Sequence, residues 1–245
     1  CKEMRHHSFG MKNIRIIPRL DIKGPNVVKP VHTEALRVVG NPKVLAEKYY
    51  SQDADELIYL DIVASLYQRN LDFELLRSVT ENIFIPITVG GGIRTIHDIN
   101  DALRSGADKV AINTHAVHHP EFIREAAKEF GSQCVVLSVE AKLRPSGTWE
   151  VFTDGGREPS GVDVIEWIKK GVDLGAGEIL INSIDRDGTR AGYDLPLITR
   201  ICEWAPVPVI VHGGGGSMES FLEAVTSGKA DAISASSVFH YDEFS

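Results

Sequence analysis

The chain of 245 residues carries 34 acidic and 26 basic side chains, and its formal net charge is −8 at pH 7. This balance argues against a general nucleic-acid-binding or membrane-binding surface, although backbone N–H groups can still bind a local anion. No apolar run approaches the ~20 residues that span a bilayer. We therefore expect a soluble, cytoplasmic protein, in which three cysteines without metal-binding spacing remain reduced.

Residues 1–10 are polar and lack the apolar centre of a signal peptide. We expect them to be a disordered or vector-derived extension, with Met11 as a natural start and residues 11–245 as a single domain. The pair His6 and His7 is too small a ligand set for a metal site. Neither a metal nor an organic cofactor is expected anywhere in the chain.

Short apolar segments rich in β-branched residues alternate along the rest of the chain with amphipathic segments of helical length. The predicted strands are Ile14–Leu20, Glu56–Ile62, Ile85–Val89, Lys109–Asn113, Cys134–Val139, Glu178–Asn182, Val207–Val211 and Ala230–Ala235. The predicted helices include Asn41–Ser51, Thr95–Ser105, Pro120–Phe130, Asp163–Leu174 and Ser217–Ser227. Eight such units in about 230 residues predict an α/β fold, a (β/α)8 TIM barrel. A doubly wound open sheet is the alternative, but it usually has fewer strands.

The second half of the chain repeats the first at offsets of 122 or 123 residues. The matching pairs are Glu56–Ile62 with Glu178–Ile184, Ile87–Gly92 with Ile210–Gly215, and Gly106–Asn113 with Lys229–Ser236. A repeat this long is not a solenoid period. It predicts a barrel built from two duplicated half-barrels.

Glycine runs follow the third and seventh predicted strands, and small polar residues end the fourth and eighth. Backbone N–H groups at glycines can approach an anion closely and form a nest. Barrels often hold phosphate after strands seven and eight, and the duplication predicts the same site after strands three and four. The runs could instead serve only as tight turns. The residues expected to bind phosphate at this C-terminal face are Gly91, Gly92, Asn113 and Thr114 in one half, and Gly214, Gly215, Ser236 and Ser237 in the other.

Acidic residues end the first and fifth predicted strands, at Asp21 and Glu140. These strands face each other across an eight-stranded barrel, and both ends point to the C-terminal mouth, where barrel enzymes carry out catalysis. Two carboxylates that flank one substrate can divide the roles of general acid and general base. Each could also be a helix N-cap or part of a strand-end salt bridge.

The loops of the predicted mouth carry further polar candidates. In the run Ser183–Thr189, Asp187 could orient substrate hydroxyls and Gly188 could bring a backbone N–H to a phosphate. Lys29 lies in a long loop after the first strand and could close over an anion, or be a solvated charge.

Four predicted strands carry a charge at their opposite end, two of each sign. These residues are Arg15, Glu56, Lys109 and Glu178. Such charges usually mark a solvated edge, but a ring of them could close the bottom of the barrel, where ion pairing would offset desolvation.

The chain resembles the cyclase subunits of imidazole glycerol phosphate synthases from Ile14 to about Phe239. The resemblance is carried by Ile-Pro-x-Leu-Asp, Val-Gly-Gly-Gly-Ile, Gly-Ala-Asp-Lys-Val-x-Ile-Asn-Thr, Phe-Gly-Ser-Gln, Gly-Ala-Gly-Glu-Ile-Leu and, most specifically, Ser-Ile-Asp-Arg-Asp-Gly-Thr. The chain ends at Ser245, where that family has a further helix, so we expect a truncated or divergent end.

The resemblance implies a half-barrel duplication that works as a heterodimer in histidine biosynthesis. A glutaminase subunit at the N-terminal face would deliver ammonia through the barrel. The cyclase would convert a bisphosphorylated aminoimidazole-carboxamide ribonucleotide into imidazole glycerol phosphate and a purine precursor. The resemblance further implies that Asp21 and Glu140 form the acid/base pair, that Lys29 is the loop lysine, and that the four rim charges form the ammonia gate. Asn182 lies at a substrate-binding position.

Four positions around this site depart from the family pattern. Glu140 stands where the family has Asp, Arg19 where it has Cys, Asn182 where it has Thr, and His212 where it has Ser. The extra methylene of Glu140 moves the carboxylate by about 1 Å, and such displacements can cost ~100-fold in rate. His212 could contact phosphate, titrate near neutral pH, or only fill space.

The departures leave two alternative functions open. They resemble a branch of cyclase-like paralogues that supply ammonia for the amidination of surface-polysaccharide sugars. The related phosphoribosyl aminoaldose isomerase of the same fold is a second alternative, which the rim charges fit less well.

Overall fold

The computed structural model describes residues 14–31, 35–65 and 67–240 of the chain. The expectations for residues 1–10, for His6 and His7, and for an end near Ser245 lie outside the described residues.

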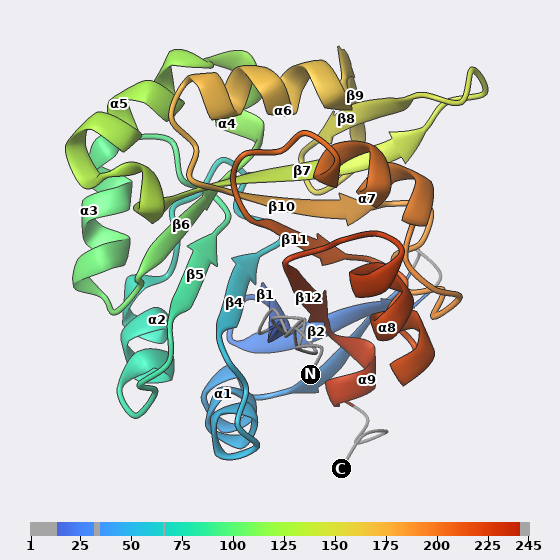
Figure 1. Ribbon diagram of the computed structural model, residues 1–245. Coiled ribbons are helices and arrows are strands. Elements are labelled where there is room, and N and C mark those ends of the chain that lie inside the picture. The colour runs from blue at the N-terminus through green and yellow to red at the C-terminus, as the bar shows by residue number, and fades with distance from the viewer. Residues whose placement is uncertain (1–13, 32–34, 66, 241–245) are drawn as a thin grey trace, which may run out of the picture.

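Eight parallel strands close into a barrel, which confirms the predicted fold (Figure 1). They are β1 (Arg15–Lys23), β4 (Leu57–Asp61), β5 (Ile87–Gly90), β6 (Lys109–Ile112), β7 (Val135–Leu143), β10 (Glu178–Ser183), β11 (Val209–His212) and β12 (Ala232–Ala235). Each strand pairs with the next in this order, and the ring closes between β12 and β1. Strands β7 and β10 pair side by side, so Glu140 lies opposite Asn182 in their register.

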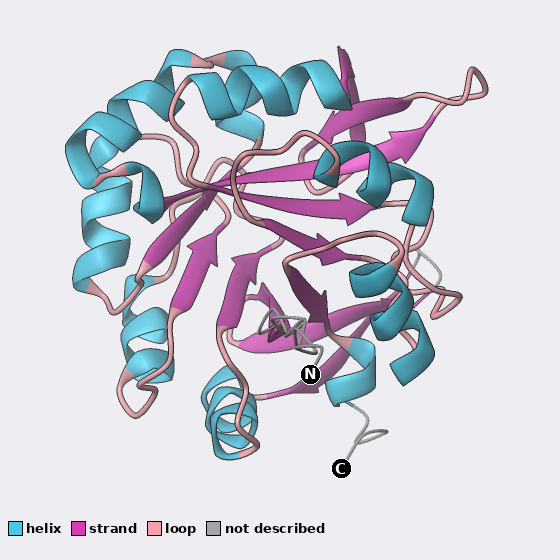
Figure 2. Cartoon of the chain, viewed as in Figure 1, coloured by secondary structure: helices cyan, strands magenta, loops and turns pink. Residues whose placement is uncertain are grey.

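Helices surround the barrel on its outer side (Figure 2). They are α1 (Pro42–Ser51), α2 (Phe73–Thr80), α3 (Ile96–Arg104), α5 (Glu121–Phe130), α6 (Val164–Asp173), α7 (Leu195–Cys202) and α8 (Met218–Thr226), with the shorter α4 (Thr114–His118), α9 (Ser237–His240) and 3-10 helix η1 (Ser132–Cys134). Both α3 and α8 begin with a capping box, at Thr95 and at Ser217. These two caps occupy equivalent places in the two halves, as the duplication predicts.

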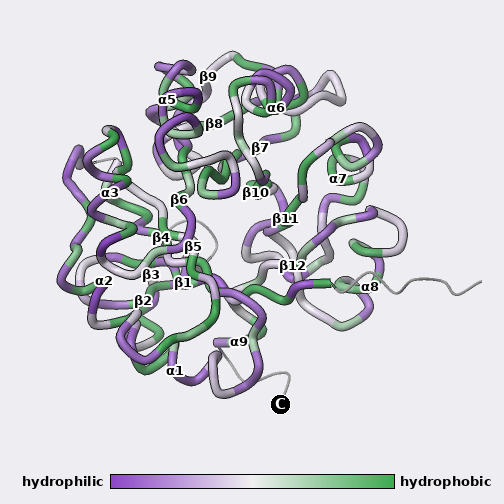
Figure 3. Tube along the Cα trace, turned by 60° about the vertical axis from the view of Figure 1, so that its left-hand side comes forward, coloured by the Kyte–Doolittle hydropathy of each residue, from purple (hydrophilic) through white to green (hydrophobic). Residues whose placement is uncertain are grey.

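The hydrophobic core has two parts. One fills the barrel interior and consists of Ile17, Ile58, Ala111, Val136, Leu180, Ile210 and Ala232. The larger part lies between the strands and the surrounding helices. In Figure 3 the helices carry both hydrophilic and hydrophobic residues, as expected where one helix face packs on the barrel.

Two β-hairpins extend the barrel, and the sequence did not predict them. Strands β2 (Asn26–Val31) and β3 (Ala35–Gly40) follow β1, and strands β8 (Trp149–Thr153) and β9 (Glu158–Asp163) follow β7. Because β2 and β8 pair antiparallel with the ends of β1 and β7, these barrel strands run beyond their predicted ends. Asp21 and Glu140 therefore lie within strands, and Lys29 lies in β2, whereas the sequence placed it in an irregular loop.

Candidate active site

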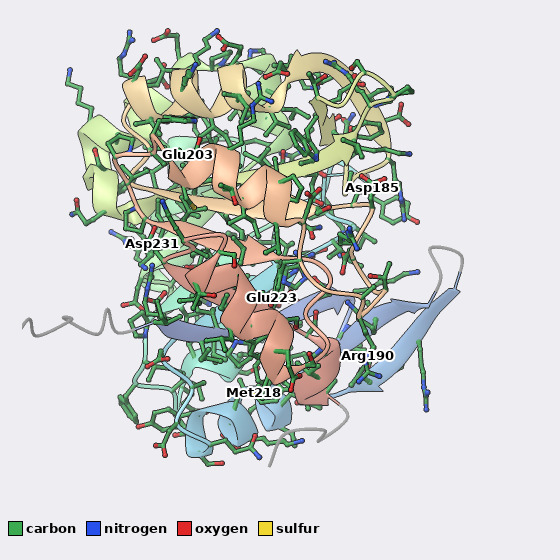
Figure 4. All side chains as sticks on the ribbon, turned by 45° about the vertical axis from the view of Figure 1, so that its right-hand side comes forward. Asp185, Arg190, Glu203, Met218, Glu223 and Asp231 are labelled. Atoms are coloured by element: carbon green, nitrogen blue, oxygen red, sulfur yellow. The ribbon has the colours of Figure 1, made fainter. Side chains whose placement is uncertain are left out.

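The carboxyl ends of the barrel strands surround a cavity of about 1350 Å³, here called the main cavity. Nine predicted site residues line it: Asp21, Gly91, Gly92, Asn113, Thr114, Glu140, Asn182, Asp187 and Gly188. The two ends of the barrel are distinct in Figure 4. Asp185 and Arg190, after β10, lie at the cavity end, whereas Glu203 and Asp231, before β11 and β12, lie at the opposite end.

Asp21 forms a buried ion pair with Arg19, which lies two residues earlier on the same strand. The Nε atom of Arg19 donates to Oδ1 of Asp21 at 2.7 Å, and both side chains are almost fully buried. Successive residues of a strand alternate between its faces, so Arg19 and Asp21 share the inward face with Ile17 of the barrel core. Burial alone would lower the pKa of Arg19, but the charges of Asp21, Glu140 and Asp187 raise it. A guanidinium cation thus lies inside the barrel, directly above the apolar layer.

Glu140 is held by its neighbour on the adjacent strand. The Nδ2 atom of Asn182 donates to Oε2 of Glu140 at 2.6 Å, and both residues are buried. Burial raises the pKa of Glu140, while the charge of Arg19 and the hydrogen bond from Asn182 oppose this rise. Asn182, which was expected to bind substrate, thus positions a carboxyl group, and its Oδ1 atom is buried without a hydrogen-bond partner among the described residues.

Lys29 lies in the glycine site of the second half, which is the expected phosphate site beside Gly214, Gly215 and Ser236. Its Nζ atom lies 3.3 Å from Oδ1 of Asp187 and 3.3 Å from Oγ of Ser236. Only 4% of Lys29 is exposed, so it is not a solvated surface charge, which was the alternative interpretation from the sequence. The remaining space beside Gly214 and Gly215 is about 10 Å³, room for about one water molecule and not for a phosphate. A phosphate bound here would contact the Lys29 side chain, which lines this pocket together with Gly214 and Gly215.

Asp187 and His212 complete the second site. Burial alone would raise the pKa of Asp187, but the nearby charges of Lys29 and Arg19 lower it. Nδ1 of His212 lies 3.1 Å from Oγ of Ser234, and Nε2 lies 3.8 Å from Oδ1 of Asp187. Burial, followed by the charge of Arg19, holds the pKa of His212 well below its usual value. This direction argues against the suggestion that His212 titrates near neutral pH. The side chain of Ser237 is outside the described part of the chain.

The glycine site of the first half opens directly into the main cavity. Gly91 has φ = +95°, and a Cβ atom there would lie 2.1 Å from the carbonyl oxygen of Asp61. Its repeat equivalent, Gly214, has φ = +100°, and a Cβ atom there would lie 2.1 Å from the carbonyl oxygen of Gly192. Both positions therefore require glycine for the turn itself. The turn also leaves backbone and the small residues Asn113 and Thr114 at the cavity surface.

The four rim charges meet in a closed ring at the opposite end of the barrel. Arg15 contacts Glu56 at 2.8 Å and Glu178 at 2.6 Å. Lys109 contacts the same two carboxylates at 3.1 Å and 3.0 Å. Each cation thus bridges both anions, and the expected ring is present. Its role as a gate stays a prediction.

Comparison with known proteins gives the family. The model of a family described as histidine biosynthesis protein matches residues 15–245. The chain belongs to this histidine biosynthesis family. A curated relative from Legionella pneumophila, named imidazole glycerol phosphate synthase subunit HisF, is 57% identical over 211 residues, which are 86% of this chain and 100% of the relative. Within the described residues, no helix is long and apolar enough to cross a membrane.

In this member of the histidine biosynthesis family, the main cavity also contains residues that the sequence analysis did not single out. His115, His118 and His119 lie beside Thr114 on or next to α4. The turn of the β8–β9 hairpin contributes Gly155, Gly156 and Arg157. The histidines were visible as a cluster in the sequence, but the turn could be placed only once the hairpin was known.

Proposed function

We propose that this chain is the cyclase subunit of an imidazole glycerol phosphate synthase. It would use ammonia to convert a bisphosphorylated aminoimidazole-carboxamide ribonucleotide into imidazole glycerol phosphate. The observation that carries the proposal is the arrangement of the cavity end, where two equivalent glycine sites flank one pair of buried carboxyl groups. A substrate with a phosphate at each end matches this arrangement. The name of the Legionella relative agrees with it.

The environments of the two carboxyl groups support a division of roles. Burial raises the pKa of Glu140, which favours its protonated form and suits a general acid. Asp21 is ion-paired with Arg19 and faces Glu140 across the barrel, and we assign it the complementary role of general base. Lys29 would move from Asp187 to a substrate phosphate, because that phosphate carries more negative charge than one carboxylate.

The ion-pair ring supports a role for the opposite face. We propose that a glutaminase subunit binds this N-terminal face and that ammonia enters through the ring of Arg15, Glu56, Lys109 and Glu178. The ring is partly buried, since its cations are about one-fifth exposed and its carboxylates less than one-tenth.

One observation favours a second candidate function, that of a paralogue that passes ammonia to a sugar amidotransferase. Arg19 occupies Oδ1 of Asp21, and Asn182 occupies Oε2 of Glu140, so both carboxyl groups are engaged within the protein. Such engagement suits a barrel that conducts ammonia without carrying out the cyclisation.

Turnover of the bisphosphorylated ribonucleotide by the purified chain with an ammonium salt separates the two candidates. The cyclase predicts formation of imidazole glycerol phosphate, and Asp21→Asn should reduce it at least ~100-fold, as expected for loss of acid–base catalysis. Tight ribonucleotide binding without turnover would contradict the cyclase and favour the ammonia conduit. Isomerisation of the aminoaldose precursor without ammonia would contradict both.

A further inference from the structure

The two hairpins of the barrel each reach the glycine site of the opposite half. The β2–β3 hairpin belongs to the first half, and its Lys29 contacts Ser236 in the second half at 3.3 Å. The β8–β9 hairpin belongs to the second half, and its Asp154 backbone N–H donates to Oγ1 of Thr114 in the first half at 2.9 Å. The halves therefore exchange hairpins across the mouth of the barrel.

The two contacts occur at equivalent places. Gly106–Asn113 aligns with Lys229–Ser236 in the repeat, so Thr114 corresponds to Ser237 and lies next to the equivalent of Ser236. Each hairpin thus meets the end of the last strand of the other half, beside that half's glycine run. The duplicated architecture places the same kind of element over both sites.

The second hairpin also presents a cation, as the first does with Lys29. Arg157 lies at the end of its turn and lines the main cavity together with Gly91, Gly92 and Thr114. Its side chain is exposed, and its guanidinium has no hydrogen-bond or ion-pair partner among the described residues. A guanidinium is well suited to phosphate, because it offers two parallel N–H donors.

We propose that Arg157 is the counterpart of Lys29 and binds the substrate phosphate at the first glycine site. This inference rests on the proposed function, because it assigns one cation to each end of a bisphosphorylated substrate. Arg157 is a binding residue for one phosphate and takes no part in proton transfer.

The turn that carries Arg157 lies next to Glu140. A Cβ atom at Gly156 would lie 3.2 Å from the Ile184 side chain and 3.7 Å from Oε2 of Glu140. The hydrogen bond from the backbone N–H of Asp154 to Thr114 joins the same turn to the first glycine site, so the turn lies between that site and Glu140. A phosphate bound by Arg157 would hold one end of the substrate beside the carboxyl pair.

Other basic side chains at the first site are less suited to this role. The guanidinium of Arg94 donates to Oδ1 of Asn70 at 2.8 Å and is already engaged. Burial lowers the pKa of His115, which makes this imidazole a weaker partner for an anion than a guanidinium. His118 and His119 are exposed at the cavity and are the remaining alternatives to Arg157 as phosphate-binding residues.

Crystals of the full chain soaked in inorganic phosphate test the assignment without reference to turnover. The variants are Arg157→Gln and Lys29→Met, and the control is Lys128→Gln on the exposed face of α5, which removes one charge far from the cavity. Arg157→Gln should lose phosphate at Gly91–Gly92 and Thr114 but keep it at Gly214–Gly215 and Ser236. Lys29→Met should lose phosphate at Gly214–Gly215 and Ser236 but keep it at Gly91–Gly92 and Thr114. The control Lys128→Gln should keep phosphate at both sites. Retention of the first phosphate in Arg157→Gln would overturn the assignment and leave the proposed function intact, whereas absence of phosphate from both sites of the parent chain would overturn both.

Steady-state kinetics with the bisphosphorylated ribonucleotide give a second readout. Loss of a charged hydrogen bond in Arg157→Gln should raise KM roughly 10- to 100-fold. It should change kcat little, because the phosphate contact is the same in the ground state and in the transition state. Arg157→Lys should recover most of the affinity. An unchanged KM in Arg157→Gln would contradict the inference, and a raised KM only in a His118→Ala, His119→Ala variant would assign the site to the histidines instead.

Discussion

Arg19 reaches Asp21 two residues along the same strand, where its Nε donates a hydrogen bond to Oδ1 at 2.7 Å inside the barrel. The contact joins one of the four departures from the family pattern to the proposed catalytic pair. The others belong to the same network, since Asn182 holds Glu140 and His212 approaches Asp187. The four positions therefore lie in one group of buried polar side chains, and substitutions within it should be coupled.

Replacement of Arg19 by Met should destabilise the fold and shift the pH profile. Removing one partner of a buried ion pair costs about 3–5 kcal/mol, because the other charge stays buried. Since the charge of Arg19 lowers the pKa of Glu140, its loss should raise that pKa further and move the corresponding limb of the activity profile to higher pH. Urea unfolding and the pH dependence of kcat check both effects. Arg200→Met on the exposed side of α7 is the matched control and should change stability by less than about 0.5 kcal/mol. Equal behaviour of the two variants would refute the role of Arg19.

Glu140→Asp should lower turnover about 100-fold, because shortening the side chain withdraws the carboxyl group by about 1 Å. It should also break the 2.6 Å hydrogen bond from Asn182. Asn182→Ala alone should impair turnover through the same contact. In a double-mutant cycle on kcat/KM, the two changes should be non-additive by about 0.5–3 kcal/mol. Higher turnover in Glu140→Asp would show that the site still follows the ordinary family pattern.

Stability should fall as the pH is lowered below about 6.5, the ordinary pKa of histidine. Burial holds the pKa of His212 well below this value, and burial lowers the pKa of His240 to about 4. The folded state keeps both rings neutral while the unfolded chain binds protons. As the pH falls below about 6.5, each of the two histidines therefore lowers the free energy of unfolding by up to about 1.4 kcal/mol per pH unit. His212→Asn should remove one such contribution between pH 7 and pH 5 in urea unfolding.

The contribution of His212 is the difference in the pH dependence of stability between His212→Asn and the unmodified chain. The raised pKa of Glu140 acts in the opposite sense, because the folded state then binds the extra proton. Ser234→Ala removes the hydroxyl beside His212 without removing a titrating group. It should alter stability but keep the pH slope. A slope unchanged in His212→Asn would rule out the buried neutral imidazole.

Lys109→Met should separate the two sources of ammonia. The change removes two of the four contacts of the rim ring and leaves Glu56 and Glu178 with Arg15 alone. Turnover with free ammonium should stay within about twofold of the parent, because the cavity end is untouched, while glutamine-driven turnover in the complex should fall by tenfold or more. If turnover fell equally with free ammonium and with glutamine, Lys109 would act on folding and not on the passage of ammonia.

Much of the fold could be predicted because eight apolar strands and their helices repeat with a regular period. The hairpins could not, and proline explains why. Pro30 lies in β2 and Pro159 lies in β9, and proline within a run argues against a strand. Both are tolerated because these strands lie in hairpins outside the barrel itself.

The residues of the candidate site could be predicted better than their contacts. The duplication indicated the glycine sites, whereas the inward position of Arg19 was recognised only when the structure showed that Ile17, Arg19 and Asp21 share one face of β1. The ion pair itself depends on side-chain conformation in a crowded interior. Likewise, the contact of Lys29 with Asp187 joins residues 158 apart, and only the tertiary structure brings them together.

The structure of the Asp21→Asn variant with bound bisphosphorylated ribonucleotide tests the central claim most directly. The account predicts one phosphate at Gly91–Gly92 and Thr114, the other at Gly214–Gly215 and Ser236, and Lys29 moved from Asp187 to the second phosphate. The body of the ligand should lie between Glu140 and residue 21. Both phosphates in one half of the barrel, or a ligand outside the main cavity, would contradict it.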